Sequence, residues 1–80
     1  MEDIVERVLA YLRTELRVDT SGLDATSPLV TTGLLDSMAL VRLVAFLERT
    51  YHVTIPDREI GAERFETLAR MRDYVASKRS

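Results

Sequence analysis

The sequence predicts an all-α fold: a small four-helix bundle, with three long helices, one short helix and a long loop between helices 1 and 2. Three observations support this prediction. Apolar residues recur at helical spacing in three segments, turn-forming residues fill the interval between the first two, and 80 residues leave room for one small core. We therefore expect residues 1–80 to form a single domain.

The first helix is predicted from about Asp3 to Arg17. Its apolar residues fall on one helical face, and they are Ile4, Val8, Leu9, Leu12 and Leu16. Asp3 lies in the first turn and Arg17 in the last, so both charges are favourable to the helix dipole.

A long loop is predicted from Val18 to about Asp36, because glycine, serine, threonine, aspartate and proline are frequent there. A loop of this length in a small domain is either functional or anchored by its own apolar residues. We expect Leu29 and Leu34 to be its buried anchors.

The second helix is predicted from about Ser37 to Tyr51. Its core stripe consists of Leu40, Leu43, Val44, Leu47 and Tyr51. Met38, Val41 and Ala45 share a different face, which begins at Ser37 and is bordered by Arg42 and Arg49. One stripe suffices for folding, so this second apolar group is either a set of ordinary exposed residues or a face that docks a partner.

The remaining elements are short. Asp57 is expected to cap a short helix that contains Arg58, Glu59 and Ile60, with Gly61 as its end. The last helix is predicted from about Glu66 to Ser77. Its inward residues are Leu68, Met71, Tyr74 and Val75, and Phe65 packs just before it.

Composition argues against several functions. Eleven basic and thirteen acidic residues give a net charge of −2 without a basic block, which disfavours nucleic-acid binding. The chain has no cysteine, and its single histidine excludes a multi-histidine metal site. No apolar run approaches a membrane span, and the N-terminus is unlike a secretory signal, so we expect a cytoplasmic protein.

The sequence offers no set of residues for catalysis. A Ser-His-Asp triad would need His52 beside Ser37, but a helix that contains both would separate them by about 22 Å. We therefore expect no enzymatic activity and no metal. Ser37 instead follows a carboxylate at a predicted helix N-terminus, where backbone N–H groups and the dipole favour an anion such as a phosphate ester. This pattern predicts an attachment point modified by another enzyme, although either Asp36 or Ser37 could also simply cap the helix.

Leu35-Asp36-Ser37-Met38, the apolar helix that follows, and Ile55-Pro56-Asp57 resemble the acyl carrier protein family over nearly the whole chain. The resemblance implies that Ser37 is esterified by 4′-phosphopantetheine from coenzyme A, and that the arm carries acyl or aminoacyl groups as thioesters. It also implies that Asp36 helps a phosphopantetheinyl transferase to engage the site. Met38, Val41, Arg42 and Ala45 would then be read by partner enzymes.

The sequence differs from carriers of primary fatty-acid synthesis in its second helix, which is usually strongly acidic in those carriers. Here Arg42 stands where such carriers typically have glutamate. The resemblance therefore favours a freestanding, monomeric carrier of polyketide or nonribosomal peptide biosynthesis. Its partners would be a transferase, a loading acyltransferase or adenylating enzyme, and downstream synthase or tailoring enzymes.

Two other functions stay open. The chain could be a helical interaction module that binds a partner without a covalent arm. It could also be a small DNA-binding bundle that uses its arginines, although the acidic balance argues against this.

Overall fold

The computed structural model describes residues 3–79, and all the regular structure in that range is helical. The elements are α1 (Ile4–Thr14), α2 (Ser37–Tyr51), the 3₁₀ helix η1 (Asp57–Glu59), α3 (Ala62–Phe65) and α4 (Leu68–Arg79). The predicted all-α bundle with three long helices and a long loop after the first is therefore confirmed. The number of short elements differs, because two of them, not one, connect α2 to α4.

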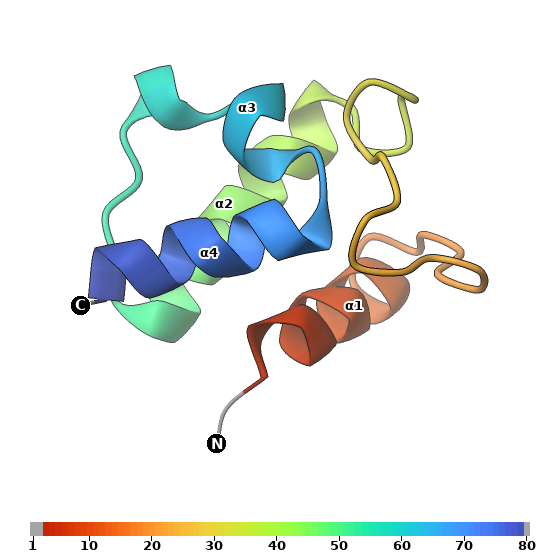
Figure 1. Ribbon diagram of the computed structural model, residues 1–80, viewed down its shortest axis with the longest axis horizontal. Coiled ribbons are helices and arrows are strands. Elements are labelled where there is room, and N and C mark those ends of the chain that lie inside the picture. The colour runs from red at the N-terminus through yellow and green to blue at the C-terminus, as the bar shows by residue number, and fades with distance from the viewer. Residues whose placement is uncertain (1–2, 80) are drawn as a thin grey trace.

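The long helices pack around one core, in which α1 contacts both α2 and α4, and α2 contacts α4 (Figure 1). The predicted stripe of α2 is buried in full, because Leu40, Leu43, Val44, Leu47 and Tyr51 all line this core. The other helices contribute Ile4, Val8, Leu12, Phe65, Leu68, Met71 and Val75. No helix within residues 3–79 is long and apolar enough to cross a membrane.

Helix α1 ends at Thr14, three residues before the predicted end. The chain turns there because Arg17 adopts a left-handed conformation, with a φ of 58°. This turn lets the Val18 N–H donate to the Leu12 carbonyl at 2.8 Å, which satisfies one of the free carbonyls at the helix end. Leu16 consequently lies beyond the helix and is only partly buried.

The loop is anchored by Leu29 and Leu35. The prediction was right for Leu29, which is fully buried, and wrong for Leu34, which is 40% exposed. The Leu35 N–H donates to the Leu29 carbonyl at 2.9 Å, so residues 29–35 form a closed loop with both ends in the core. Because Leu35 occupies the buried position, its neighbour Leu34 is left at the surface.

The segment before α4 also differs from the prediction. Asp57 is the first residue of η1 and not its cap, which is Pro56, and Ile60 lies just after the element. Gly61 begins α3 as its N-cap instead of ending a helix. Helix α4 starts at Leu68, two residues later than predicted and separate from α3.

The Thr67 hydroxyl explains this later start of α4. It accepts from the Arg70 N–H at 3.1 Å and so satisfies one donor in the first turn of α4. Threonine is a favoured residue at such a position, since its side chain competes with the backbone for hydrogen bonds. The chain therefore begins a new helix there and does not extend α3.

Candidate functional site

Asp36 is the residue that caps α2. It has an extended backbone, its carboxylate accepts from the Ala39 N–H at 2.8 Å, and its carbonyl accepts from the Leu40 N–H at 2.9 Å. The sequence left open whether Asp36 or Ser37 takes this role, and the structure assigns it to Asp36. Ser37 therefore does not cap the helix.

Ser37 is the first residue of α2, and its side chain is exposed. No hydrogen bond of its hydroxyl occurs among residues 3–79. The amides of Ser37 and Met38 belong to the first turn, whose N–H groups have no acceptor within a helix. The first turn of α2 contains no acidic residue, so an anion on the Ser37 oxygen would meet the positive end of the helix dipole, with the Asp36 cap as its neighbour.

Buried residues anchor the backbone on either side of this serine. Leu35 is 2% exposed and Leu40 is 7% exposed, so both the end of the loop and the first turn of α2 are packed into the core. A hydroxyl that is exposed while the neighbouring backbone is packed against the core is accessible to a large enzyme without local unfolding.

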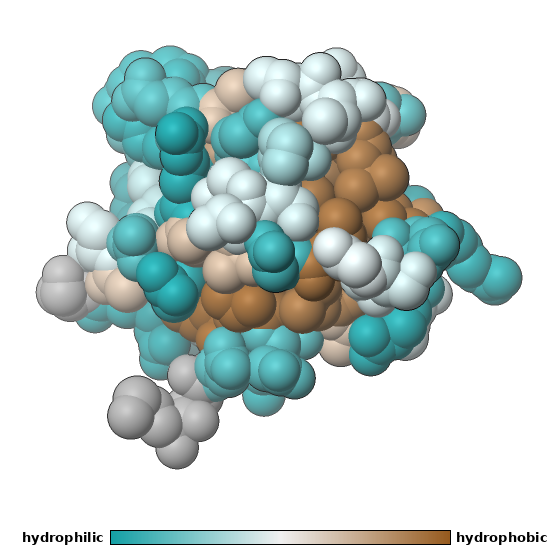
Figure 2. Space-filling model, turned by 45° about the vertical axis from the view of Figure 1, so that its right-hand side comes forward, coloured by the Kyte–Doolittle hydropathy of each residue, from teal (hydrophilic) through white to brown (hydrophobic). Residues whose placement is uncertain are grey.

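Met38, Val41, Arg42 and Ala45 all lie on the exposed surface of α2, and we call them the outer face of α2. Their spacing of three and four residues places them on one side of the helix. Met38 is 72% exposed and Val41 is 56% exposed, which is unusual for large apolar side chains. Figure 2 brings forward the side that bears the loop between α1 and α2, and it shows a broad hydrophobic area there among hydrophilic residues.

The charge that α2 presents is positive. Its only acidic residue, Glu48, accepts from the Ile55 N–H at 2.9 Å and so holds the segment after the helix. Arg42 and Arg49 make no ion pair among the described residues. A partner that approaches this surface would therefore meet apolar side chains together with guanidinium groups.

His52 lies at the opposite end of α2 from Ser37, as its C-cap, with a φ of 56°. The structure therefore does not bring the histidine and the serine together. Within residues 3–79, no three or more histidine and carboxylate side chains cluster closely enough to hold a metal ion.

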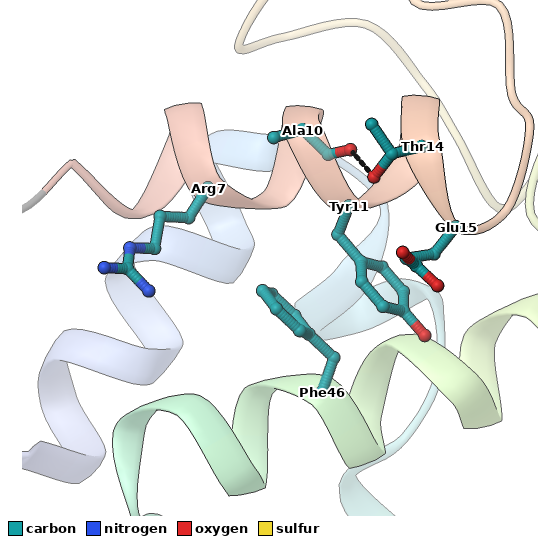
Figure 3. A pocket seen from close by; sticks show the side chains of 6 residues that line it. All are labelled: Arg7, Ala10, Tyr11, Thr14, Glu15 and Phe46. Carbon is teal, nitrogen blue, oxygen red and sulfur yellow. Dashed lines mark hydrogen bonds between the residues drawn. The ribbon is translucent and has the colours of Figure 1, made fainter.

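An open hollow with a volume of about 350 Å³ lies between α1 and α2 and was not predicted from the sequence (Figure 3). It is lined by Arg7, Ala10, Tyr11, Thr14, Glu15 and Phe46. The rings of Tyr11 and Phe46 stack with centroids 4.3 Å apart, and the Tyr11 hydroxyl donates to the Arg42 carbonyl at 3.2 Å. The stack joins α1 to α2 just beneath the outer face. The aromatic character of the two residues is the only sequence signal that could have indicated it.

Comparison with known proteins identifies the class to which this helical fold and its serine belong. The model of the phosphopantetheine attachment site family matches residues 6–75, so the chain belongs to that family of acyl carrier proteins. It is a phosphopantetheine carrier, and 4′-phosphopantetheine is its covalent cofactor. Carriers of this family generally lack catalytic activity and interact with phosphopantetheinyl transferases and synthase enzymes.

A solved structure titled "Crystal structure of FAD-dependent dehydrogenase" contains a similar chain. The two chains are 32% identical, and they superpose with a TM-score of 0.73. The likeness covers 85% of this chain and 97% of that one, so the two are of similar length.

Proposed function

We propose that Ser37 is the residue that carries 4′-phosphopantetheine, and that the arm presents acyl or aminoacyl thioesters to partner enzymes. The observation that carries this proposal is the exposed, unengaged hydroxyl at the N-terminus of α2 in a chain of this family. When attached, the arm supplies a thiol that holds the cargo. Ser37 supplies the hydroxyl, and the first-turn N–H groups stabilise the phosphodiester charge.

The other described serines are less suited to this role. The Ser21 hydroxyl donates to Asp19 at 2.7 Å, and the Ser27 hydroxyl donates to Asp24 at 3.2 Å. Ser77 lies near the C-terminal end of α4, where the helix dipole disfavours a phosphate group. Ser37 alone among these four combines a free hydroxyl with a favourable helix end.

Asp36 is proposed to serve the phosphopantetheinyl transferase in two ways. Its carboxylate caps α2 through Ala39 and so fixes the serine, and it remains exposed for recognition by the transferase. The outer face of α2 is proposed to dock the transferase, the loading acyltransferase or adenylating enzyme, and the downstream enzymes. Such contacts should be small and weak, because a carrier has to release each partner.

The charge of α2 supports partners that are apolar and acidic at their docking sites. Arg42 and Arg49 would be repelled by a basic docking patch, whereas carboxylates would attract them. We therefore propose a carrier of polyketide or nonribosomal peptide biosynthesis. The similarity to a chain in a structure of an FAD-dependent dehydrogenase also makes such a dehydrogenase a candidate tailoring partner. We also predict that residues 1–80 form one domain without catalytic activity. The protein is further predicted to be monomeric and cytoplasmic.

Intact-mass spectrometry after incubation with coenzyme A and a broad-specificity phosphopantetheinyl transferase tests the assignment. Wild type and Ser21→Ala, a control that removes a different exposed hydroxyl, should each gain one phosphopantetheine, and Ser37→Ala should gain none. Because Asp36 is the cap, Ser37→Ala should change the free energy of unfolding by no more than about 0.5 kcal/mol. Addition to Ser37→Ala would overturn the site. No addition to folded wild type would favour the non-covalent interaction module, for which the outer face of α2 would be the binding surface.

A further inference from the structure

The closed loop of residues 29–35 leads directly into the proposed attachment site. Its base is the hydrogen bond from the Leu35 N–H to the Leu29 carbonyl, and the Thr32 hydroxyl donates to the same carbonyl at 3.3 Å. Gly33 allows the turn within it, with a φ of 81° and its N–H donating to the Val30 carbonyl at 3.0 Å. Asp36 follows at once, so any movement of this loop also moves the cap of α2.

Glu66 holds this loop from the opposite part of the chain. Its carboxylate accepts from the Val30 N–H and from the Thr31 N–H, each at 2.9 Å, and from the Thr31 hydroxyl. Its backbone carbonyl also accepts from the Leu29 N–H at 2.8 Å. One residue thus receives four hydrogen bonds from three consecutive loop residues.

Glu66 is itself well anchored. It is the C-cap of α3, and its N–H donates to the Ala62 carbonyl at 3.0 Å. A second backbone bond, from the Ala69 N–H to the Ala25 carbonyl at 3.0 Å, joins the start of α4 to the same long loop. The junction of α3 and α4 is therefore joined to the long loop by two backbone hydrogen bonds and lies beside it (Figure 1).

We propose that Glu66 is a positioning residue for the modification of Ser37: by holding Val30 and Thr31, its carboxylate fixes the loop that places Asp36 and Ser37 before the transferase. This inference rests on the proposed role of Ser37. The two buried leucines fix the ends of the loop, and Val30 is the one apolar side chain between them that packs against the core. Glu66 provides the third point that a loop needs to adopt one orientation.

The loop also carries Leu34, which is 40% exposed and three residues before Ser37. A transferase that docks on the outer face of α2 would pass close to this side chain. Glu66 therefore acts on two parts of the recognition surface, the serine and the exposed leucine beside it. A displacement of about 1 Å of a reacting group can lower a rate by about 100-fold, so loss of the third point should be measurable in catalysis.

The test is the kcat/KM of phosphopantetheinylation, measured on the full chain with coenzyme A and one transferase. Glu66→Ala should lower kcat/KM by about 10- to 100-fold. Glu66→Gln keeps an acceptor oxygen but loses the charge, so its rate should fall between those of wild type and Glu66→Ala. Thr67→Ala is the matched control, because it removes the α4 cap at the neighbouring residue without touching the loop.

A spectroscopic measurement separates positioning from general destabilisation. In Glu66→Gln, the amide NMR signals of Val30, Thr31, Asp36 and Ser37 should shift, while those of α1 stay unchanged. In Thr67→Ala, the loop signals should stay as in wild type even if the protein is less stable. The second measurement decides the question if Glu66→Ala does not fold.

Three results would count against the inference. Wild-type kcat/KM in Glu66→Gln with unmoved Asp36 and Ser37 signals would refute it, and so would an equal loss of rate in Thr67→Ala. If wild type itself were not modified, the assignment of Ser37 would fail, and this inference would fall with it.

Discussion

Replacing Asp36 by alanine removes the carboxylate that accepts the Ala39 N–H at 2.8 Å. The variant leaves that amide to solvent, because no other side chain contributes to the cap of α2. Loss of such a cap costs about 1 kcal/mol, with a range of about 0.5–2. For a domain of this size, each kcal/mol corresponds to about 4–8 °C in Tm. Calorimetry should therefore show a fall in Tm of several degrees.

Asp36→Asn is the matched control, since asparagine caps helices about as well as aspartate. Its Tm should stay within a degree or two of wild type, whereas Asp36→Ala should fall. Equal Tm values for wild type and Asp36→Ala would refute the assignment of the cap, because the hydrogen bond to Ala39 would then contribute nothing to stability.

The same pair of variants separates capping from recognition by the transferase. If the transferase reads the negative charge, Asp36→Asn should be modified as slowly as Asp36→Ala despite its wild-type stability. Modification of Asp36→Asn at the wild-type rate would show that Asp36 acts only as a cap. The charge-recognition role implied by the family resemblance would then be wrong.

Three further predictions concern stability. Leu35→Ala should lower the free energy of unfolding in urea by about 2–5 kcal/mol, and Leu34→Ala by much less, because only Leu35 is buried. Similar losses in the two variants would contradict this difference in burial. His52→Gly should raise the Tm, because glycine adopts a positive φ without the cost of about 1 kcal/mol that a side chain imposes; an unchanged or lower Tm would show that the imidazole makes a compensating contact. Hydrogen bonds from Thr31 lower the pKa of Glu66 from its usual 4.5, so its stabilising effect is present above pH 4.5 and lost as the pH falls through the lowered value. The difference in free energy of unfolding between wild type and Glu66→Gln should therefore shrink from pH 7 to pH 3. A constant difference would show that protonation of Glu66 does not affect stability.

Helix α2 could be predicted with nearly its observed bounds because its signals agree. Its apolar stripe has a regular helical period, Asp36 is a strong N-cap, and the stripe ends at Tyr51. The positions of Asp36 and Ser37 followed from the same signals, together with the exposed Met38 and Val41. Local sequence is informative here because each of these features is decided within one or two turns of helix.

The loop and its support could not be predicted, because distant contacts decide them. Two consecutive leucines carry no signal about which one is buried, and the hydrogen bond between Leu29 and Leu35 settles the matter in favour of Leu35. The sequence prediction uses Glu66 only as the approximate start of the last helix. Its contact with Thr31 spans 35 residues of sequence, which no periodicity or motif can indicate.

The structure separates what stabilises the bundle from what a partner would contact. Leu40, Leu43 and Leu47 hold α2 in the core, while Met38 and Val41 are exposed enough to be replaced without leaving a cavity. The surface that we propose as the docking site can therefore change its shape and charge while the fold and Ser37 stay the same. If this face docks partners, the guanidinium groups of α2 serve partner choice and not folding. Related carriers with an acidic second helix would then keep the same core and accept partners of the opposite charge.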